Sequence, residues 1–257
     1  MWTTAIWLVG GILVWATGWW LVALALRRND LADVAWGLGF VTLAVVLALL
    51  GPLERGHLLL YGMVAVWGFR LSIHIHVRNR RKGEDFRYRK WREEWGGGAA
   101  LRAFLQVFLL QTAILVVVAA PLLAAAADPG GPPLGVLALA GGLLWGVGLL
   151  FEAVGDWQLL RFKSDPENRG QIMTRGLWRY TRHPNYFGEV VLWWGLFLVV
   201  LPTAHGIWAI VSPVTMTILI LFVSGIPMLE AKYEDDPEWE AYRRRTSAFL
   251  PMPPRSG

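Results

Sequence analysis

The sequence predicts an all-α integral membrane protein, built as a bundle of about seven transmembrane helices with interfacial segments on the cytoplasmic side. Composition is the first observation: of 257 residues 55% are hydrophobic, 16 are Trp and none is Cys, and the mean hydropathy is +0.44. These values are typical of membrane proteins and fall outside the range of soluble globular ones. The second observation is the spacing of the apolar residues, and the third is the placement of the charges.

Seven apolar runs give the expected helices, and most are close to the ~20 residues that a helix needs to cross a bilayer. In chain order they cover residues 5–26, 34–51, 58–77, 103–127, 134–155, 186–203 and 207–229. The first run has no basic stretch before it and no small-residue cleavage site after it, so we expect it to be retained. Short connections at 128–133 and 202–206 suit tight turns between antiparallel helices. We therefore expect one transmembrane domain over residues 1–257.

The basic residues set the expected orientation, because Lys and Arg accumulate on the cytoplasmic side of a membrane protein. Four alternate connections, at 27–28, 78–102, 161–182 and 232–255, hold 22 of the 24 basic residues. We therefore expect the N-terminus outside and the C-terminus in the cytoplasm. The pI of 9.8 then reflects orientation, and no nucleic-acid partner is needed to explain it. A compact chain rich in Ala, Leu and Trp, with no organelle signal, favours a bacterial inner membrane.

Several kinds of site are excluded by what the sequence lacks. Without Cys there is no disulfide, thiolate catalysis or Cys-ligated metal, and no His, Asp and Glu set has metal-ligand spacing. There is also no Gly-rich Rossmann fingerprint, so a dinucleotide would have to be held by the membrane fold itself. Two inner segments, 78–102 and 156–183, are polar, basic and aromatic. We expect the functional site there, at the cytoplasmic end of the bundle.

The start of the sixth helix is the first specific feature. Pro184 suits the first turn of a helix, where its missing N–H has no partner to lose. A helix that begins there directs free N–H groups and the positive end of its dipole toward the cytoplasm. Arg175, Arg179, Arg182 and His183 come just before it. This arrangement predicts an anion site, and a ligand that carries phosphate is the natural guest.

Beyond Pro184, three residues are spaced by one helical turn. Asn185, Glu189 and Trp193 lie at i, i+4 and i+8, so they share one face of the helix. An amide, a carboxylate and an indole in a row can hold a flat ring that carries a carboxamide. The alternative is that Glu189 pairs with Arg70 and joins two helices. Because an ionisable residue inside a span is costly and usually functional, we favour ligand binding.

These residues carry a family resemblance. The stretch "RHPNYFGEVVLWWG" resembles the C-terminal signature of the steroid 5α-reductase family, particularly its bacterial branch of membrane proteins. The resemblance extends to "DLADVAWGLGF", "WGFRLSIHIHVRNRRKGEDFRY" and "DWQLLRFKSDPENRG", and the signature region covers 134–257. For this chain it implies a multi-helix membrane fold, NADPH as hydride donor, and reduction of a carbon–carbon double bond in a steroid-like or isoprenoid lipid that arrives from the bilayer.

The resemblance also implies site residues, position by position. Four match the nicotinamide-side motif of that family: Asn185, Gly188, Glu189 and Trp193. Two match upstream polar positions that contact the cofactor, Asp156 and Lys163. A basic cluster, Arg78, Arg80 and Arg81, matches one near the cofactor phosphates, where we also expect Arg179 and Arg182. Besides the cofactor and substrate, membrane lipids are the expected partners.

Two alternatives belong to other functional classes. Isoprenylcysteine carboxyl methyltransferases and related membrane methyltransferases also carry the pattern "RHP.Y.G" before a late span, where it helps to bind S-adenosylmethionine. The Asn after the proline and the Glu after the glycine favour the reductase. The remaining alternative is a lipid-binding membrane protein without catalysis.

The proton donor is where this chain departs from the steroid reductases. Those enzymes polarise the substrate carbonyl with a Glu and a Tyr from the N-terminal half, and here Trp67 stands at the Tyr position. The candidate replacements are His74, Tyr61, Tyr186 and Asp33. The plainer readings are an interfacial histidine for His74 and a carboxylate paired with Arg70 for Asp33.

Two further segments have simple default interpretations. Residues 83–95, "GEDFRYRKWREEW", alternate charges with aromatics, which predicts an interfacial helix on anionic lipid, with a cofactor lid as the alternative. The tail after Lys232 resembles the cytoplasmic end of the reductase superfamily, which packs over the cofactor. A solvated tail is its alternative.

Overall fold

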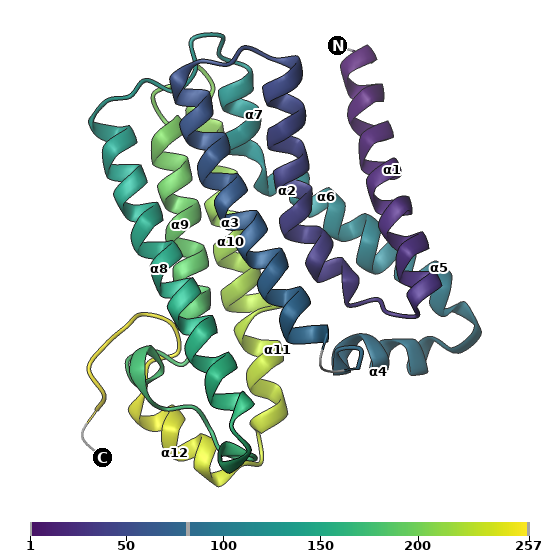
Figure 1. Cartoon of the computed structure of the whole chain (residues 1–257), viewed down its shortest axis with the longest axis vertical. Coiled ribbons are helices and arrows are strands. Elements are labelled where there is room, and N and C mark those ends of the chain that lie inside the picture. The colour runs from purple at the N-terminus through teal and green to yellow at the C-terminus, as the bar shows by residue number, and fades with distance from the viewer. Residues whose placement is uncertain (1, 81–82, 256–257) are drawn as a thin grey trace. The chain divides into compact units, whose positions relative to one another are not determined.

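The computed structural model describes residues 2–80 and 83–255, and in this part of the chain every regular element is helical. Among the described residues, five helical segments are long and apolar enough to cross a membrane: α2 (Leu31–Leu50), α3 (Arg55–Arg80), Phe86–Val118, α8 (Val136–Ser164) and Gly206–Tyr233. Two shorter apolar helices add to them, Gly10–Leu26 within α1 (Trp2–Leu26) and α9 (Pro184–Val200). Each of the seven predicted runs falls largely within one of these segments. The protein is therefore an all-helical integral membrane protein (Figure 1).

The chain forms two compact units, which we describe separately. Unit 1 comprises Met1–Leu53 and His57–Leu122, and unit 2 comprises Glu54–Gly56 and Leu123–Gly257. The single domain expected from the sequence stays a prediction.

In unit 1 the segment predicted to be interfacial is the helix α4 (Phe86–Trp95), which runs across the direction of α1 and α2 in Figure 1. Asp85 caps its first turn by accepting a hydrogen bond from the Arg87 backbone N–H at 3.0 Å. Tyr88, Trp91 and Trp95 pack with Trp19 and Trp20 of α1 in one apolar cluster. The aromatic side of α4 is thus covered by protein, and four of its charged side chains are exposed at the surface: Arg89, Lys90, Glu93 and Glu94.

The fourth predicted span is not one regular helix. After α5 (Ala99–Ala103) come a π-helical turn (Phe104–Leu109), α6 (Leu110–Val118), a break at Ala119 and α7 (Ala120–Ala126). Pro121 accounts for the break, because proline has no N–H to donate to the carbonyl four residues earlier. Mid-span irregularities of this kind are often found beside functional sites.

In unit 2, α8 and α9 form a close antiparallel pair that glycines make possible (Figure 1). A Cβ on Gly148 would lie 2.6 Å from the Gly188 carbonyl oxygen, and one on Gly141 would lie 2.5 Å from that of Gly195. Gly155, one heptad beyond Gly148, meets the first turn of α9 at Pro184. The pattern is the small-residue contact that allows membrane helices to approach closely.

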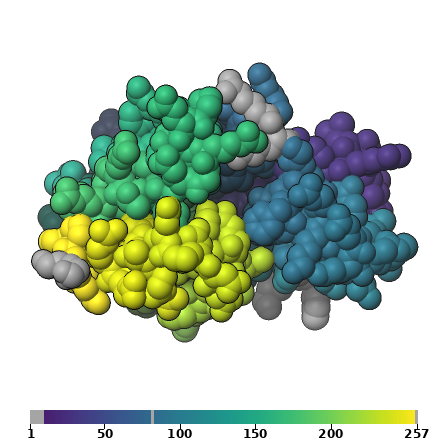
Figure 2. All heavy atoms as spheres, turned by 90° about the horizontal axis from the view of Figure 1, so that it is seen from below, coloured from purple at the N-terminus to yellow at the C-terminus, as the bar shows by residue number. Residues whose placement is uncertain are grey.

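Further elements of unit 2 include the 3₁₀ turn Gly206–Ile210, α10 (Val211–Ile218), the π-turn Leu219–Val223, α11 (Ile226–Glu230) and α12 (Pro237–Arg245). Beyond α12 the C-terminal segment runs back along the loop before α9. There the backbone N–H of Arg182 donates to the Ser247 carbonyl oxygen at 2.9 Å. The backbone N–H of Met252 donates to the Tyr180 carbonyl oxygen, also at 2.9 Å. Figure 2 shows this segment in yellow beside the green loop. The tail is thus packed on the protein.

Candidate functional site

The loop before α9 is held in place by Arg182, whose side chain is 8% exposed. Its Nε and Nη2 donate to the two carboxylate oxygens of Glu230 at 2.9 and 3.1 Å. Its Nη1 donates to the carbonyl oxygens of Arg243 and Thr246 at 3.0 and 2.9 Å. The bidentate ion pair with Glu230 fixes the loop to α11, and the two bonds to carbonyl oxygens fix it to the end of α12. The phosphate contact predicted for Arg182 would require these bonds to be replaced.

His183 is part of the same network. Its Nε2 lies 2.9 Å from Glu230 Oε1, and its ring stacks on Tyr186 with centroids 5.6 Å apart. Burial lowers the pKa of His183 below its ordinary value, although the nearby Glu230 carboxylate opposes the shift. The imidazole is therefore neutral at pH 7 and adds no positive charge to an anion site. Of the cations predicted there, Arg175 and Arg179 are exposed and have no ion-pair partner within the described residues.

α9 begins at Pro184 as the sequence predicts, and its first turn contains the most informative polar contact of unit 2. Asn185 Nδ2 donates to Asp156 Oδ1 at 3.1 Å, and Asp156 is buried on α8. The other end of the amide, Asn185 Oδ1, is buried and has no hydrogen-bond partner within the described residues. Because the Asn185 NH₂ group is bonded to Asp156, the carbonyl oxygen Oδ1 is left as a buried acceptor without a hydrogen-bond donor within the described residues.

The other predicted residues of unit 2 fall into two groups. Glu189 is half-buried on α9, one turn beyond Asn185, and Trp193 is fully buried one turn further. Gly188 is a packing residue, because a Cβ there would lie 2.4 Å from the Glu152 backbone nitrogen. Lys163 lies exposed in the last turn of α8. The structure thus brings Asp156 to Asn185, and leaves Lys163 and Arg179 on the surface.

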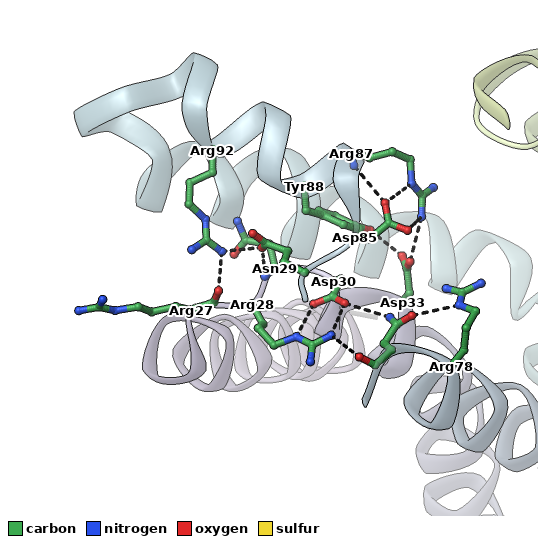
Figure 3. Close-up of polar contacts among 12 residues, drawn as sticks. Arg27, Arg28, Asn29, Asp30, Asp33, Arg78, Asp85, Arg87, Tyr88 and Arg92 are labelled. Atoms are coloured by element: carbon green, nitrogen blue, oxygen red, sulfur yellow. Dashed lines mark hydrogen bonds and ion pairs between the residues drawn. The ribbon is translucent and has the colours of Figure 1, made fainter. Parts of the chain in front are cut away.

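In unit 1, Arg78 ends a chain of buried polar contacts (Figure 3). Asp30, 1% exposed, accepts from Arg28 Nη2 at 2.7 Å and from Asn79 Nδ2 at 3.0 Å. Asn79 Oδ1 in turn accepts from Arg78 Nε at 3.0 Å. The Arg78 Nη1 and Nη2 groups have no hydrogen-bond partner within the described residues. Asn79 therefore positions the guanidinium through Nε, and the two terminal nitrogens can still donate to a ligand. Arg80 is exposed on the same helix, and Arg81 lies outside the described residues.

The rest of the cluster in Figure 3 consists of ion pairs and hydrogen bonds in which protein groups bond one another. Asp33 accepts from the Tyr88 hydroxyl at 2.5 Å and from Arg87 Nη2 at 3.2 Å. The expectation that Asp33 pairs with Arg70 is therefore wrong, because α4 supplies both partners. Glu84 accepts from Arg92 Nη2 at 2.5 Å and from the Asn29 backbone N–H at 2.7 Å.

Sequence reasoning did not single out Asp30, Asn79 and Glu84 in this cluster. The signal was present in the runs "RRND" and "KGED", where an acidic residue sits beside basic ones in each of two inner connections. Such pairs can satisfy each other once the helices bring them together.

Apart from Asp33, the three other predicted proton donors occupy different places. Tyr61 is 6% exposed on α3, its hydroxyl has no partner within the described residues, and its ring lies 5.8 Å from that of His57. His74 is half-buried on the same helix, one turn before Arg78. At 1.5 Å per residue, 13 positions put Tyr61 and His74 about 20 Å apart, so one site cannot use both. Tyr186 stacks on His183 in unit 2.

The family model described as "Protein of unknown function (DUF1295)" matches residues 19–246. The match therefore runs from the middle of α1 to the end of α12 and includes the described polar clusters of both units. Comparisons with curated proteins and with solved structures found no match.

Proposed function

The chain belongs to the DUF1295 family, and we propose that it is a membrane-embedded, NADPH-dependent reductase of a carbon–carbon double bond in a steroid-like or isoprenoid lipid. One observation carries the proposal: the buried Asn185 Oδ1 has no hydrogen-bond donor within the described residues. Buried polar atoms in native proteins are nearly always paired, so a ligand donor is expected there. The nicotinamide carboxamide supplies such a donor in its NH₂ group.

The surroundings of Asn185 fit this role. Asp156 holds the amide nitrogen at 3.1 Å, so the side chain cannot turn its acceptor away without losing that bond. Glu189, one turn along α9, carries a carboxylate on the same face, and a carboxylate can only accept hydrogen bonds. When bound, NADPH would supply the hydride. Asn185, Asp156 and Glu189 would bind and orient the carboxamide, and the packed C-terminal segment would fix the loop that leads into α9.

Exposed cations near the start of α9 supply the expected contacts to phosphate. Arg175 and Arg179 precede α9 and have no ion-pair partner within the described residues, unlike Arg182. A further contact from Arg78 of unit 1 is predicted by the resemblance. The proposal also draws on that resemblance to the steroid 5α-reductases, whose motif "HPNYFGE" the chain carries.

The test is nucleotide binding to the purified protein in lipid nanodiscs. NADPH should bind more tightly than NADH, and S-adenosylmethionine should not compete. Asn185→Ala should weaken NADPH binding by about 0.5–1.5 kcal/mol, the usual net value of a hydrogen bond, and Glu189→Gln should weaken it as well. The matched control is Asn168→Ala, which removes an amide bonded to the Phe162 carbonyl at 3.1 Å.

Each alternative has its own outcome. Tight binding of S-adenosylmethionine in place of NADPH would favour the methyltransferase, and binding of neither would favour a lipid-binding protein. A purely structural pair between Glu189 and Arg70 predicts that Glu189→Gln lowers stability by ~3–5 kcal/mol with unchanged NADPH affinity. If Asn168→Ala weakens NADPH binding as much as Asn185→Ala, the assignment of Asn185 fails. With a lipid enone present, loss of the reduced-nicotinamide absorbance would report the reaction.

A further inference from the structure

The C-terminal segment beyond α12 is held against the loop before α9 by hydrogen bonds and by ring packing. The Thr181 hydroxyl donates to the Phe249 carbonyl oxygen at 2.9 Å, and the Met252 backbone N–H donates to the Tyr180 carbonyl oxygen at 2.9 Å. The Phe249 ring packs edge-on against Phe187 of α9, with centroids 5.6 Å apart. These contacts fix the path of the segment along the loop.

Three large side chains of this fixed region are exposed. Leu250 is 57% exposed, Met252 is 52% exposed and Tyr180 is 44% exposed. Leu250 and Met252 are separated by one residue, and the bond from Met252 to Tyr180 brings the tyrosine to the same place. Because the backbone here is bonded, the exposure does not come from a loose chain end. Grouped apolar side chains at a surface mark a contact with a partner or a membrane. We call these three residues the C-terminal patch.

The C-terminal patch lies where the spans of unit 2 end. At 1.5 Å per residue, ~20 residues of α8 cross ~30 Å of hydrocarbon, so a span that starts at Val136 ends near Gly155. The Trp178 indole donates to the Gly155 carbonyl oxygen at 3.1 Å, and Tyr180 follows two residues later. Figure 1 shows the yellow C-terminal segment level with the lower turns of α8. The patch is therefore at the height of the lipid headgroups, where Tyr is enriched.

The charge around the patch is positive. Three segments lie at this end of unit 2, residues 157–164, 175–183 and 246–255, and none of them contains Asp or Glu. Arg161 lies over the exposed Trp157 ring, 5.7 Å from its centroid. The exposed cations of the three segments are Arg161, Lys163, Arg175, Arg179 and Arg255. Apolar and aromatic side chains among cations are typical of a surface that binds anionic lipid.

We propose that the C-terminal patch inserts into the headgroup layer of the bilayer and binds anionic phospholipid there, with Arg161 and Arg255 as the cations that meet the lipid phosphates. Arg175 and Arg179 stay assigned to the cofactor. The inference concerns an interaction surface and does not depend on the proposed reductase activity. A second copy of the chain is the other occupant that the test distinguishes.

The test is the depth of a spin label in the bilayer. The chain has no Cys, so a single introduced cysteine is the only labelling site. Leu250→Cys and Met252→Cys carry the label, and the matched control is Glu238→Cys, at an exposed residue of α12. Each protein is placed at one copy per nanodisc, in phosphatidylcholine that contains phosphatidylglycerol.

Depth is measured by comparing collisions of the label with oxygen, which concentrates in hydrocarbon, and with a water-soluble nickel chelate. We expect the labels at positions 250 and 252 to lie about 5–10 Å inside the headgroup boundary, as the apolar side of an interfacial segment does. The label at position 238 should remain in water.

A second measurement tests the charge. The label at position 252 should lie deeper in discs that contain phosphatidylglycerol than in phosphatidylcholine alone, and high salt should reduce the difference. Arg255→Gln should reduce it by about half, because one of the two cations at the patch is lost. The matched control is Arg169→Gln, since Arg169 is an exposed cation of the connection after α8 and lies outside the three segments. That variant should leave the difference unchanged.

The inference is overturned if the labels at positions 250 and 252 are as exposed to water as the label at position 238. Protection that appears only with two copies per disc also overturns it and assigns the patch to a contact between chains. Equal depth with and without phosphatidylglycerol, or equal effects of Arg255→Gln and Arg169→Gln, rejects the binding of anionic lipid. If one labelled variant does not fold, the other decides. None of these measurements involves NADPH, so their failure leaves the proposed reductase untouched.

Discussion

Two arginines of the basic segments, Arg78 and Arg182, differ in what their guanidinium groups bond. Arg182 donates hydrogen bonds from Nε, Nη1 and Nη2 to Glu230 and to two carbonyl oxygens, so its charge is paired inside the protein. Arg78 donates a hydrogen bond from Nε alone, to Asn79, and its terminal nitrogens have no hydrogen-bond partner within the described residues. Because removing one member of a buried ion pair strands the other, we expect loss of Arg182 to affect stability first.

Arg78→Gln tests the anion-binding role of this guanidinium. If Arg78 bonds a phosphate of NADPH, the substitution should weaken NADPH binding by roughly the 1.5–3 kcal/mol of a charge-assisted hydrogen bond. It should also make the affinity less sensitive to salt, because one screened attraction is lost. The measurement is NADPH titration at two salt concentrations. Arg92→Gln is the control, since Arg92 is paired with Glu84 at 2.5 Å; an equal loss of affinity there would refute the specific contact.

His183 leads to a pH-dependent prediction. Burial lowers its pKa in the folded protein, so the unfolded chain takes up a proton more readily. Its contribution to stability is therefore complete above the unfolded pKa of ~6.5 and is lost as the pH falls through the lower folded value. The groups beside the ring are Arg182, Glu230 and Tyr186. The melting temperature of wild type should fall more than that of His183→Gln on acidification from about pH 7. Parallel curves would show that His183 does not titrate in this way.

At the scale of elements, the α8–α9 pair shows why glycine recurs in both helices. Gly141, Gly148 and Gly155 repeat at seven-residue intervals along α8, and Gly188 and Gly195 do so along α9. The backbones approach so closely that no Cβ fits between them. The same contact places Asp156 next to Asn185, so the geometry of the candidate site depends on this packing.

Gly188→Ala should therefore destabilise the protein by about 1–3 kcal/mol, as overpacking does, because its new Cβ would lie 2.4 Å from backbone atoms of α8. The measurement is thermal unfolding in nanodiscs. The matched control is Gly146→Ala, since a Cβ at that position of α8 meets nothing within 4 Å. That variant should be neutral or slightly more stable, in line with the helix preference for alanine. Equal effects of the two substitutions would refute the close approach at Gly188.

Some elements could be predicted from the sequence because their causes are local. The apolar runs fixed the helical segments, and Pro184 marked the start of α9 because its missing N–H suits a first turn. Pairings that depend on three-dimensional approach could not be predicted. Nothing local shows that Asp33 faces α4, that Glu84 reaches Arg92, or that Arg182 is bonded to Glu230, 48 residues away. The spacing of Asn185, Glu189 and Trp193 identified one helix face, but the orientation of the amide depends on Asp156.

At the scale of the whole molecule, the distribution of charge is the strongest constraint on how the chain sits in a membrane. Many of the inner cations have acidic neighbours, including Arg28, Arg87 and Arg92 in unit 1. These local pairs leave the orientation argument unaffected, because it depends on the number of Lys and Arg in each connection and Asp and Glu contribute little. The inner arginines therefore have two independent effects: they form local ion pairs, and their number on one side sets the orientation of the chain in the membrane.

Orientation can be measured directly. With 22 of 24 basic residues in alternate connections, the C-terminus is expected in the cytoplasm and the N-terminus outside. A C-terminal reporter that works only in the cytoplasm should be active, and one that works only outside should be silent. Replacing Arg243, Arg244 and Arg245 by Gln removes three of the five basic residues of the last connection and is not expected to invert the reporters, because 19 of the remaining 21 basic residues would still lie in inner connections. The reverse pattern in wild type would place the predicted phosphate-binding arginines outside the cell. NADPH, a cytoplasmic cofactor, could not then reach them, and the proposed reductase would be rejected.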